Sequence, residues 1–367
     1  MIPTNDVPLP EKTGGKGLVA VLMSGGVDSS AAALLLQNAG YDIAGLTMRI
    51  MESDENAVES AAVVCKTLSV PHFWVDLKNE FHKFVIEPFC TSYMQGETPN
   101  PCADCNERVK LGLLSEIAAT RWGAEAKIAT GHYARILRSN GTTCLCRAQN
   151  LKKDQSYFLA GVRYPVLERL LFPLGEMDSK EETRKLVREA GIAVADRPES
   201  MEICFANERD YRDLSGHSAT PGVILDTEGK KIGEHTGIAH YTLGQRKGLG
   251  IASPHPLYVV EIRPRDNVVV AAPRELAFTD VVNAEYANIL LPEETRSGAL
   301  LFGKIRSQGE PAPCRILRID ENRVSVRFER PLFAPAPGQR LVLYTEEGCV
   351  ALGGRIAKAD SERFLDI

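Results

Sequence analysis

One turn constrains the first half of the chain most strongly, because it joins an apolar run to a helical run through two glycines. It spans Leu22 to Ser30 (LMSGGVDSS), after the apolar run Leu18 to Met23 and before the alanine- and leucine-rich run Ser30 to Gln37. Glycine has no Cβ and tolerates positive φ, so Gly25 and Gly26 let the backbone bend and approach a ligand closely. The following helix directs free N–H groups and its positive dipole end at the turn. The sequence therefore predicts a strand, a phosphate-binding turn and a helix.

The polar residues of this turn indicate a nucleotide with its metal. Ser24, Ser29 and Ser30 can donate hydroxyl hydrogen bonds to an anion, and the acidic Asp28 is expected there if Mg2+ accompanies the anion. A Walker loop is excluded because it needs a lysine followed by Ser or Thr, and a dinucleotide fingerprint is excluded because it needs three spaced glycines. The alternative is a tight strand-to-helix turn in which a serine caps the helix.

The rest of the first half alternates strand-like and helix-like runs. In chain order they are Leu18 to Met23, Ser29 to Gly40, Ile43 to Arg49, Ala57 to Leu68, His72 to Asp76, Val109 to Trp122, Ala126 to Thr130 and Lys180 to Ala190. This alternation favours a parallel sheet covered by helices. Ligands of such sheets bind at the carboxyl ends of the strands, where the glycine turn, Met48 and Gly131 would lie together.

The second half has a different sequence pattern, with closely spaced turn signals and valine-rich segments in which apolar and polar residues alternate with a period of two. Examples are Tyr258 to Ile262, Asn267 to Ala271 and Arg323 to Phe328. A chain of 367 residues also exceeds the size at which a single core keeps growing. We expect a disordered tail over residues 1–16, an α/β domain over 17–205, a small mixed connector over 206–276 and a β-rich domain over 277–367.

Composition limits the class of protein. The chain is 44% hydrophobic and 25% charged, which is typical of a globular protein. A net charge of -5 neither indicates nor excludes nucleic-acid binding, which depends on a local basic face. The polar first residues do not resemble a signal peptide, and no apolar run approaches membrane-spanning length. Nine cysteines, an odd number scattered over a large chain, favour a reducing cytoplasm over a secreted disulfide framework.

Three cysteines indicate sulfur chemistry. Cys102 and Cys105 lie in a proline-stiffened loop, Thr98 to Asn106, just before a predicted helix whose N-terminus would lower the pKa of Cys105 and favour a nucleophilic thiolate. Cys204 lies in a short apolar run at the predicted edge of the α/β domain. The alternatives are half of a zinc site for Cys102 and Cys105, although the chain has no second CxxC pair, and a small buried hydrophobe for Cys204.

Seven segments together resemble one known family. They are LMSGGVDSS, TPNPCADCN, IATGHYAR, KKDQSYFL, ICF, YTLGQRKGLG and LGGRI. Their order and spacing are similar to those of the bacterial tRNA-specific 2-thiouridylases (MnmA, also called TrmU), members of the PP-loop ATP pyrophosphatase superfamily. The resemblance covers nearly everything after the tail. It implies an α/β fold: a PP-loop parallel-sheet domain of the adenine nucleotide alpha-hydrolase type, a small mixed connector and a C-terminal β-barrel.

The resemblance implies a sulfurtransferase that replaces the C2 oxygen of the wobble uridine of tRNA with sulfur. ATP would adenylate that oxygen with Mg2+ present, and Cys105 and Cys204 would deliver the sulfur. An upstream protein would donate the sulfur, and the tRNA partners would be of the Lys, Glu and Gln type. The implied ATP-binding residues are Leu22, Met23, Ser24, Gly25, Gly26, Val27, Asp28, Ser29, Met48 and Gly131.

The same resemblance implies residues that contact the tRNA. The target base would meet Asn100, Pro101 and Cys102. The remaining tRNA contacts would be His132, Lys153, Asp154, Gln155, Arg306 and Gln339. A further segment, Gln245 to Gly248, places two cations on a glycine-rich hairpin, which suits phosphate contacts but also fits a merely solvated loop.

Cys102 is a departure from many family members, which carry aspartate at that place. Cys102, Cys105 and Cys204 could therefore be the three thiolate ligands of a [4Fe-4S] cluster whose free iron holds a hydrosulfide. The alternative is a persulfide and disulfide relay through Cys105 and Cys204. The three-thiol set favours the cluster. The other six cysteines, expected to be structural, are Cys65, Cys90, Cys144, Cys146, Cys314 and Cys349.

Overall fold

The chain divides into two compact units. A computed structural model describes residues 5, 15–139, 141–195, 203–205 and 220–358. The first unit comprises Met1–Val85, Cys102–Glu202 and Gly348–Val350, and the second comprises Ile86–Pro101, Ile203–Glu347 and Ala351–Ile367. Most of the predicted disordered tail lies outside the described residues, as do residues 206–219 at the start of the predicted connector. The four predicted domain ranges stay predictions.

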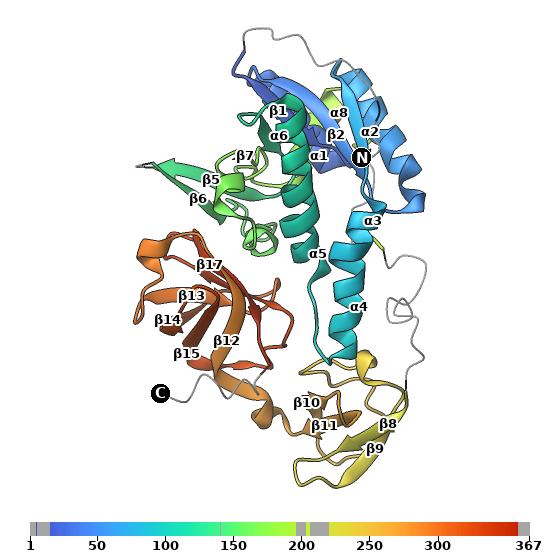
Figure 1. The fold of residues 1–367 in the computed structure, drawn as a ribbon, viewed down its shortest axis with the longest axis vertical. Coiled ribbons are helices and arrows are strands. Elements are labelled where there is room, and N and C mark those ends of the chain that lie inside the picture. Colours follow the sequence, from blue (N-terminus) through green and yellow to red (C-terminus); the bar gives the residue numbers. More distant parts are fainter. Residues whose placement is uncertain (1–4, 6–14, 140, 196–202, 206–219, 359–367) are drawn as a thin grey trace. The chain divides into compact units, whose positions relative to one another are not determined.

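A five-stranded parallel sheet forms the centre of the first unit (Figure 1). Its strand order is β3–β2–β1–β4–β7, and every neighbouring pair is parallel. The strands are β1 (Leu18–Leu22), β2 (Asp42–Arg49), β3 (His72–Asp76), β4 (Lys127–Ala129) and β7 (Leu170–Leu171). The chain moves outward from β1 to β3 and then returns to the other side of β1. The predicted parallel sheet is thus confirmed, with its topological switch point between β1 and β4, where ligands of such sheets bind.

Helices pack on this sheet through small and branched residues. The principal ones are α1 (Val27–Asn38), α2 (Glu55–Thr67) and α8 (Lys180–Glu189). Ala31, Ala32 and Ala33 of α1 are almost fully buried, and their short side chains let the helix approach the sheet closely. Helix α8 packs on α1 and begins at Ser179, whose side chain accepts a hydrogen bond from the backbone of Glu182.

The cysteine-bearing segment of the first unit is helical earlier than predicted. The expected helix over Val109 to Trp122 begins at Pro101, and its consecutive parts are α5 (Pro101–Asp104), the π-helical η3 (Cys105–Leu113) and α6 (Leu114–Trp122). Proline favours the first helical position because its missing N–H would have no partner there. Cys105 therefore lies in the second turn of a continuous helix, and the expectation of a loop up to Asn106 is wrong.

Smaller elements complete the first unit. A two-stranded antiparallel hairpin is formed by β5 (Ala134–Ser139) and β6 (Thr142–Arg147). The short helices are η1 (Glu52–Asp54), α3 (Lys78–Phe81), η2 (His82–Ile86), η4 (Ser156–Leu159) and α7 (Tyr164–Leu167).

The second unit is rich in β structure, as the alternating segments and turn signals of its sequence predict. A four-stranded sheet has the order β10–β11–β8–β9, and a closed antiparallel barrel has the order β12–β15–β14–β13–β16–β17. The sheet strands are β8 (Gly222–Leu225), β9 (Lys231–His235), β10 (Tyr258–Arg263) and β11 (Val268–Ala272). The barrel strands are β12 (Phe278–Ile289), β13 (Leu300–Lys304), β14 (Ala312–Ile319), β15 (Arg323–Phe333), β16 (Arg340–Tyr344) and β17 (Val350–Ile356).

Helix α4 (Glu87–Met94) belongs to this second unit although it precedes the cysteine helix in the chain. The loop after α4 is fixed to the barrel end, because Arg355 bonds Ser92 and Glu97 and the backbone N–H of Thr98 donates to Pro337 O at 2.7 Å. The remaining short helices are η6 (Ile238–His240), η7 (Arg274–Ala277) and η8 (Pro292–Glu294). Over the described ranges, no helix is both long and apolar enough to cross a membrane.

Candidate active site

The predicted phosphate-binding turn lies at the carboxyl end of β1. Its hydroxyls form a local network: Ser29 Oγ lies 3.3 Å from both the backbone N and the Oγ of Ser24 and donates to Gly26 O at 3.1 Å. Ser30 Oγ donates to the same carbonyl at 2.9 Å. Gly26 is the residue before α1, and no side chain caps that helix end. The N-terminus of α1 therefore keeps N–H groups directed at the turn, as an anion site requires.

Two glycines are required by close packing around this turn. Gly25 has φ +70°, and a Cβ there would lie 2.6 Å from the Cβ of Ser60 in α2. Gly131, which follows β4, would place a Cβ 2.7 Å from the carbonyl carbon of Asp28 and 2.8 Å from the backbone N of Ser29. The segments after β1 and β4 thus touch at the switch point, as the sequence pattern predicts.

The end of β2 closes another side of the turn. Met23 donates its backbone N–H to Leu46 O at 2.9 Å, and Thr47 Oγ1 donates to Met23 O at 2.9 Å. Met48 is half-buried as the next residue of β2. The structure therefore brings the predicted ATP-binding residues Leu22 to Ser29, Met48 and Gly131 to one edge of the sheet.

Asp28 carries the principal charge interaction at the turn. Its carboxylate pairs with Lys180 Nζ, at the start of α8, and accepts a hydrogen bond from Tyr133 Oη at 3.2 Å. Tyr133 Oη also lies 2.8 Å from Oγ1 of the fully buried Thr183. The Lys180 side chain is 12% exposed and the Asp28 side chain 36%, so only the lysine side of this ion pair is well shielded from water.

The cysteines differ in exposure. Cys105 is buried, with 7% of its surface exposed, whereas Cys102, one helical turn earlier, is exposed. Desolvation raises the pKa of the Cys102 thiol, Lys110 opposes this rise and Asp104 adds to it. Because Cys102 is exposed, we expect that rise to be small. The effect of the helix dipole falls off within the first helical turn. The dipole therefore stabilises a thiolate at Cys105 less than it would stabilise one at the N-terminus of the helix.

The described residues do not supply a cluster site. No group of three or more His, Cys, Asp and Glu side chains within the described ranges could hold a metal ion. Cluster ligation needs three converging thiolates. The predicted [4Fe-4S] cluster on Cys102, Cys105 and Cys204 is therefore not supported.

Family models match almost the whole chain in three consecutive parts. A tRNA methyl transferase HUP domain matches residues 17–208, a tRNA methyl transferase PRC-barrel domain matches 215–273, and an aminomethyltransferase beta-barrel domain matches 280–356. The tRNA-specific 2-thiouridylase MnmA of Lachnoclostridium phytofermentans is 41% identical over 92% of this chain and 98% of its own. The tRNA-specific 2-thiouridylase MnmA of Nostoc sp. is 39% identical over 94% of this chain and 99% of its own.

The chain belongs to the tRNA-specific 2-thiouridylase (MnmA) family. The resemblance inferred from the seven sequence segments is thus confirmed. Among solved structures, an NH3-dependent NAD synthetase from Campylobacter jejuni is 20% identical with a TM-score of 0.32, covering 49% of this chain and 66% of that chain. A TM-score this low does not establish a shared fold.

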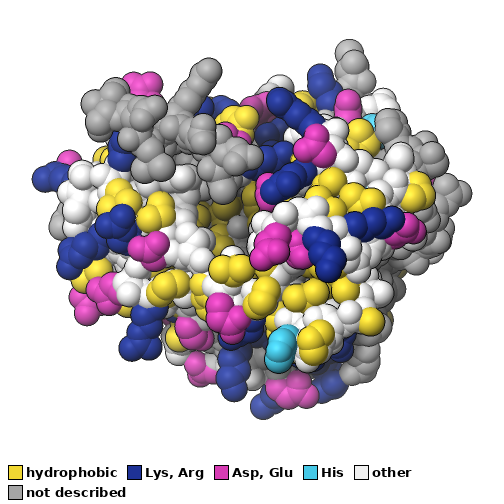
Figure 2. Space-filling view, turned by 90° about the horizontal axis from the view of Figure 1, so that it is seen from below, with side chains coloured by type: hydrophobic (Ala, Val, Ile, Leu, Met, Phe, Trp, Pro, Cys, Tyr) yellow, Lys and Arg dark blue, Asp and Glu magenta, His cyan; other side chains and the backbone are white. Residues whose placement is uncertain are grey.

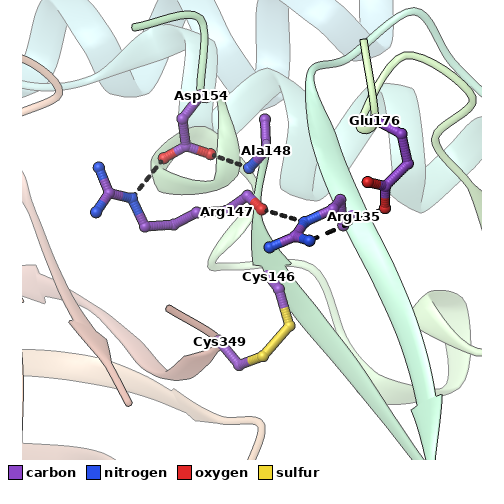
Figure 3. Close-up of a disulfide and its surroundings, with 7 residues drawn as sticks. All are labelled: Arg135, Cys146, Arg147, Ala148, Asp154, Glu176 and Cys349. Atoms are coloured by element: carbon purple, nitrogen blue, oxygen red, sulfur yellow. Dashed lines mark hydrogen bonds and ion pairs between the residues drawn. A yellow bond between two sulfur atoms is a disulfide. The ribbon is translucent and has the colours of Figure 1, made fainter. Parts of the chain in front are cut away.

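In this 2-thiouridylase family member, three of the predicted tRNA-contact residues are held by internal contacts of the first unit. Asp154 accepts from the backbone N–H groups of Ala148 and Ser156, both at 3.1 Å, and its side chain is 1% exposed (Figure 3). Gln155 Oε1 accepts from the backbone of Tyr133 at 2.9 Å. Both side chains thus shape the segment after β4, and their contact with tRNA stays a prediction together with that of Lys153.

His132 is the third of these residues. Its Nδ1 lies 2.7 Å from Thr130 Oγ1, and its ring packs edge-on against Phe172. Burial, with a smaller contribution from Lys110, lowers the pKa of His132 to about 3. The imidazole is therefore neutral at neutral pH and can act on a substrate through a hydrogen bond rather than through charge.

Two predicted RNA-contact residues meet within the second unit. Asn100 Nδ2 lies 3.5 Å from Gln339 Oε1, and Gln339 Nε2 lies 3.5 Å from Pro99 O, both at the long limit for hydrogen bonds. Arg306, by contrast, donates to the carbonyls of Phe333 and Ala334 at 3.1 and 2.8 Å. The Arg306 guanidinium is thus already used by the barrel, and its predicted tRNA contact would need these bonds to be shared.

A disulfide between Cys146 and Cys349 was not predicted. Cys146 lies in β6 and Cys349 just before β17, and the two backbones also form a β-bridge (Figure 3). Both cysteines were expected to be structural, but no sequence signal paired them, because 203 residues separate them.

Sequence reasoning also missed Lys180, Tyr133 and Thr183. Lys180 and Thr183 could have been suspected only as residues of the helix over Lys180 to Ala190, with no sign that it reaches the turn. Tyr133 lies within the IATGHYAR segment but was assigned no role.

Proposed function

We propose that this chain catalyses the ATP-dependent 2-thiolation of the wobble uridine of tRNA. The observation that carries the proposal is the glycine turn at the switch point, packed against Gly131, in a chain about 40% identical over nearly its whole length to proteins named tRNA-specific 2-thiouridylases. A turn built from backbone N–H groups and serine hydroxyls suits the phosphates of ATP. The reaction class explains why nucleophilic cysteines accompany a nucleotide site in one chain.

The first step of the proposed reaction activates the base. The C2 oxygen of uridine attacks the α-phosphorus of ATP, the bond between the α- and β-phosphates breaks, and pyrophosphate leaves. Ser24 to Ser29 would hold the phosphates, with Met48 and Gly131 beside the adenosine. An oxygen bound directly to the base is a poor leaving group, whereas the same oxygen leaves readily as part of AMP.

The second step transfers sulfur. A persulfide on Cys204, charged by a sulfur donor protein, attacks C2 of the adenylated base, and the C–O bond breaks to release AMP. The Cys105 thiolate then attacks the Cys204 sulfur, so that the terminal sulfur stays on C2 and a Cys105–Cys204 disulfide forms. A dithiol reductant returns the two thiols.

Asp28 is suited to hold Mg2+ for the first step. Mg2+ keeps several waters and is bound by one or two carboxylates together with substrate phosphates, so a single carboxylate suffices. Both contacts of Asp28 within the described residues involve Oδ1, which leaves Oδ2 for the metal. The bound ion would neutralise phosphate charge. Lys180, paired with Asp28, would add a second cation beside the same phosphates.

The sulfur relay is proposed through Cys105 and Cys204, with no step assigned to an iron–sulfur cluster. Anaerobic purification followed by iron and acid-labile sulfide analysis tests this choice. We expect no stoichiometric iron and an active protein. Iron in a constant ratio to the chain, lost together with activity in a Cys102→Ala variant, would contradict the relay and restore the cluster.

The function itself is tested by reconstitution. The full chain, ATP, Mg2+, a persulfide-generating donor and unmodified tRNA of the Lys, Glu or Gln type are expected to yield 2-thiouridine and AMP, measured by nucleoside mass analysis. Cys105→Ser and Cys204→Ser should each lower thiolation at least about 1,000-fold while ATP-dependent adenylation persists, because the nucleophile is lost but the turn is not. Cys90→Ser, a half-buried cysteine of α4, is the matched control. Unchanged thiolation in both variants would refute the relay.

A cytoplasmic location belongs to the same proposal, since tRNA and the reducing dithiol meet there. The proposed tRNA contacts are those implied by the family: Asn100, Pro101 and Cys102 at the target base, and His132, Lys153, Asp154, Gln155, Arg306 and Gln339 elsewhere.

A further inference from the structure

A loop of the second unit forms an open pocket that the proposed chemistry does not use. The loop joins η6 to β10, and the pocket within it has a volume of about 540 Å³. Its lining consists of Arg246 and the stretch from Gly248 to Leu257, and most of these residues are exposed. Ligand pockets of proteins commonly span about 300–1,000 Å³, so the volume is sufficient for part of a nucleotide chain.

The base of this loop is fixed by hydrogen bonds. Gln245 Oε1 accepts from the backbone of Thr242 at 3.1 Å, and Gln245 Nε2 donates to Lys247 O at 3.0 Å. The backbones of Gly244 and Gln245 bond that of Val259 in β10. Leu249 is buried in the apolar core of the four-stranded sheet.

Two cations of the loop have no partner among the residues that the structure describes. Arg246 and Lys247 are exposed, and neither side chain makes a hydrogen bond or ion pair with any residue that the structure describes. Two other arginines of this unit are engaged: Arg306 bonds two carbonyls and Arg263 bonds Glu261. Unpaired cations at this pocket are available to an external anion without first breaking an internal bond.

The sequence around the loop contains no acidic residue that would pair with the two cations or repel a phosphate. Between Glu234 and Glu261 the chain contains no Asp or Glu, although the protein as a whole carries a net charge of -5. On the face that Figure 2 presents, Lys and Arg side chains are interspersed with Asp and Glu. The loop is thus a local cationic region, and local charge rather than net charge is the footprint of nucleic-acid binding.

We propose that the loop from Gly244 to Leu257 is a phosphate-binding pocket for the backbone of the tRNA substrate. The inference rests on the proposed function and adds a docking site to the assigned contacts. Arg246 and Lys247 would bind phosphate oxygens, and the exposed backbone at Gly248 and Gly250 lets a sugar–phosphate chain approach closely. Such contacts position an RNA without reading its sequence, so they would strengthen binding for all substrate tRNAs alike.

The test is the salt dependence of tRNA affinity in the full chain. A double variant, Arg246→Gln with Lys247→Gln, is expected to weaken binding of an unmodified tRNA transcript about tenfold and to lower the slope of log affinity against log salt by about 1 for each cation removed. Thiolation at saturating tRNA should stay unchanged, because the proposed role of the two cations is to bind the tRNA backbone and not to take part in the reaction. Ala252→Trp, which keeps both cations but fills the pocket, should weaken binding as well.

The matched control removes two cations from the four-stranded sheet to which the loop is attached. Lys230 and Lys231 are exposed on the β8–β9 hairpin outside the pocket, and Lys230→Gln with Lys231→Gln should leave the salt slope unchanged. Equal slopes for the loop variant and the wild type, or equal losses in loop and control variants, would overturn the pocket while leaving the proposed function intact. A wild-type chain that neither binds nor thiolates tRNA would refute both.

Discussion

The two strand ends that meet at the switch point are built in different ways. After β1, the turn from Ser24 to Asp28 consists of glycine backbone and short hydroxyls that bond within the turn itself. After β4, the segment from Thr130 to Tyr133 depends on side chains from distant places, among them Gln155 and Thr183. A backbone-built site is encoded locally, whereas a site built from side chains depends on the whole fold being in place.

The largest effect is expected from a Cβ in the turn. Gly25→Ala should abolish adenylation, with at least about a 100-fold loss, and lower the free energy of unfolding by about 2–4 kcal/mol, because it adds positive-φ strain to overlap with Ser60. AMP formation and urea unfolding measure the two effects. Gly40→Ala is the matched control, since Gly40 has φ +84° but a Cβ there meets nothing within 4 Å. Similar losses in both variants would mean that packing at the turn does not matter.

Removing the lysine that faces the turn should have the next largest effect. Lys180→Met leaves the Asp28 carboxylate without its cation and removes a positive charge from the proposed phosphate site, so adenylation should fall about 10- to 100-fold. Initial rates over a range of Mg2+ concentrations measure it, and part of the loss should be recovered at high Mg2+. Lys185→Met, which removes an exposed lysine of the same helix, serves as the control. A full rate in Lys180→Met would show that α8 only packs against the turn.

The difference between the two strand ends explains which parts of the fold and the site the sequence predicts. The parallel sheet, the turn and the meeting of Gly131 with the start of α1 were encoded in local patterns: apolar runs, paired glycines and strand order. The contact of Lys180 with Asp28 could not be predicted, because 152 residues separate the two in the sequence. The Cys146–Cys349 disulfide could not be predicted either, because 203 residues separate the two cysteines. The helix at Pro101 was misplaced because the prolines before it were read as loop-forming, although one of them begins the helix.

The hydroxyl of Tyr133 should contribute less than the lysine. Tyr133→Phe removes the group that joins Asp28 to Thr183, and the free energy of unfolding should fall by about 1 kcal/mol, the usual net value of one hydrogen bond. Adenylation should change by less than about tenfold, since the ion pair with Lys180 remains. Tyr164→Phe removes a hydroxyl that accepts from Thr143 N at 2.9 Å, away from the turn, and provides the comparison. A loss of adenylation as large as that of Lys180→Met would assign Tyr133 to the chemistry.

The pH dependence of stability tests the second strand end. Because folding lowers the pKa of His132 from 6.5 to about 3, the unfolded chain binds this proton more readily between those values, and stability is lost as pH falls below 6.5. His132→Asn keeps a polar partner for Thr130 and removes the titration, so the unfolding free energy should decline less between about pH 7 and about pH 5. Part of the decline should persist, because burial also lowers the pKa of His72 and His235. Urea unfolding at both pH values measures the change, with His82→Asn, at an exposed position of η2, as the control. An identical decline in wild type and His132→Asn would mean that water reaches the imidazole, and the second strand end would then be as open to solvent as the turn it faces.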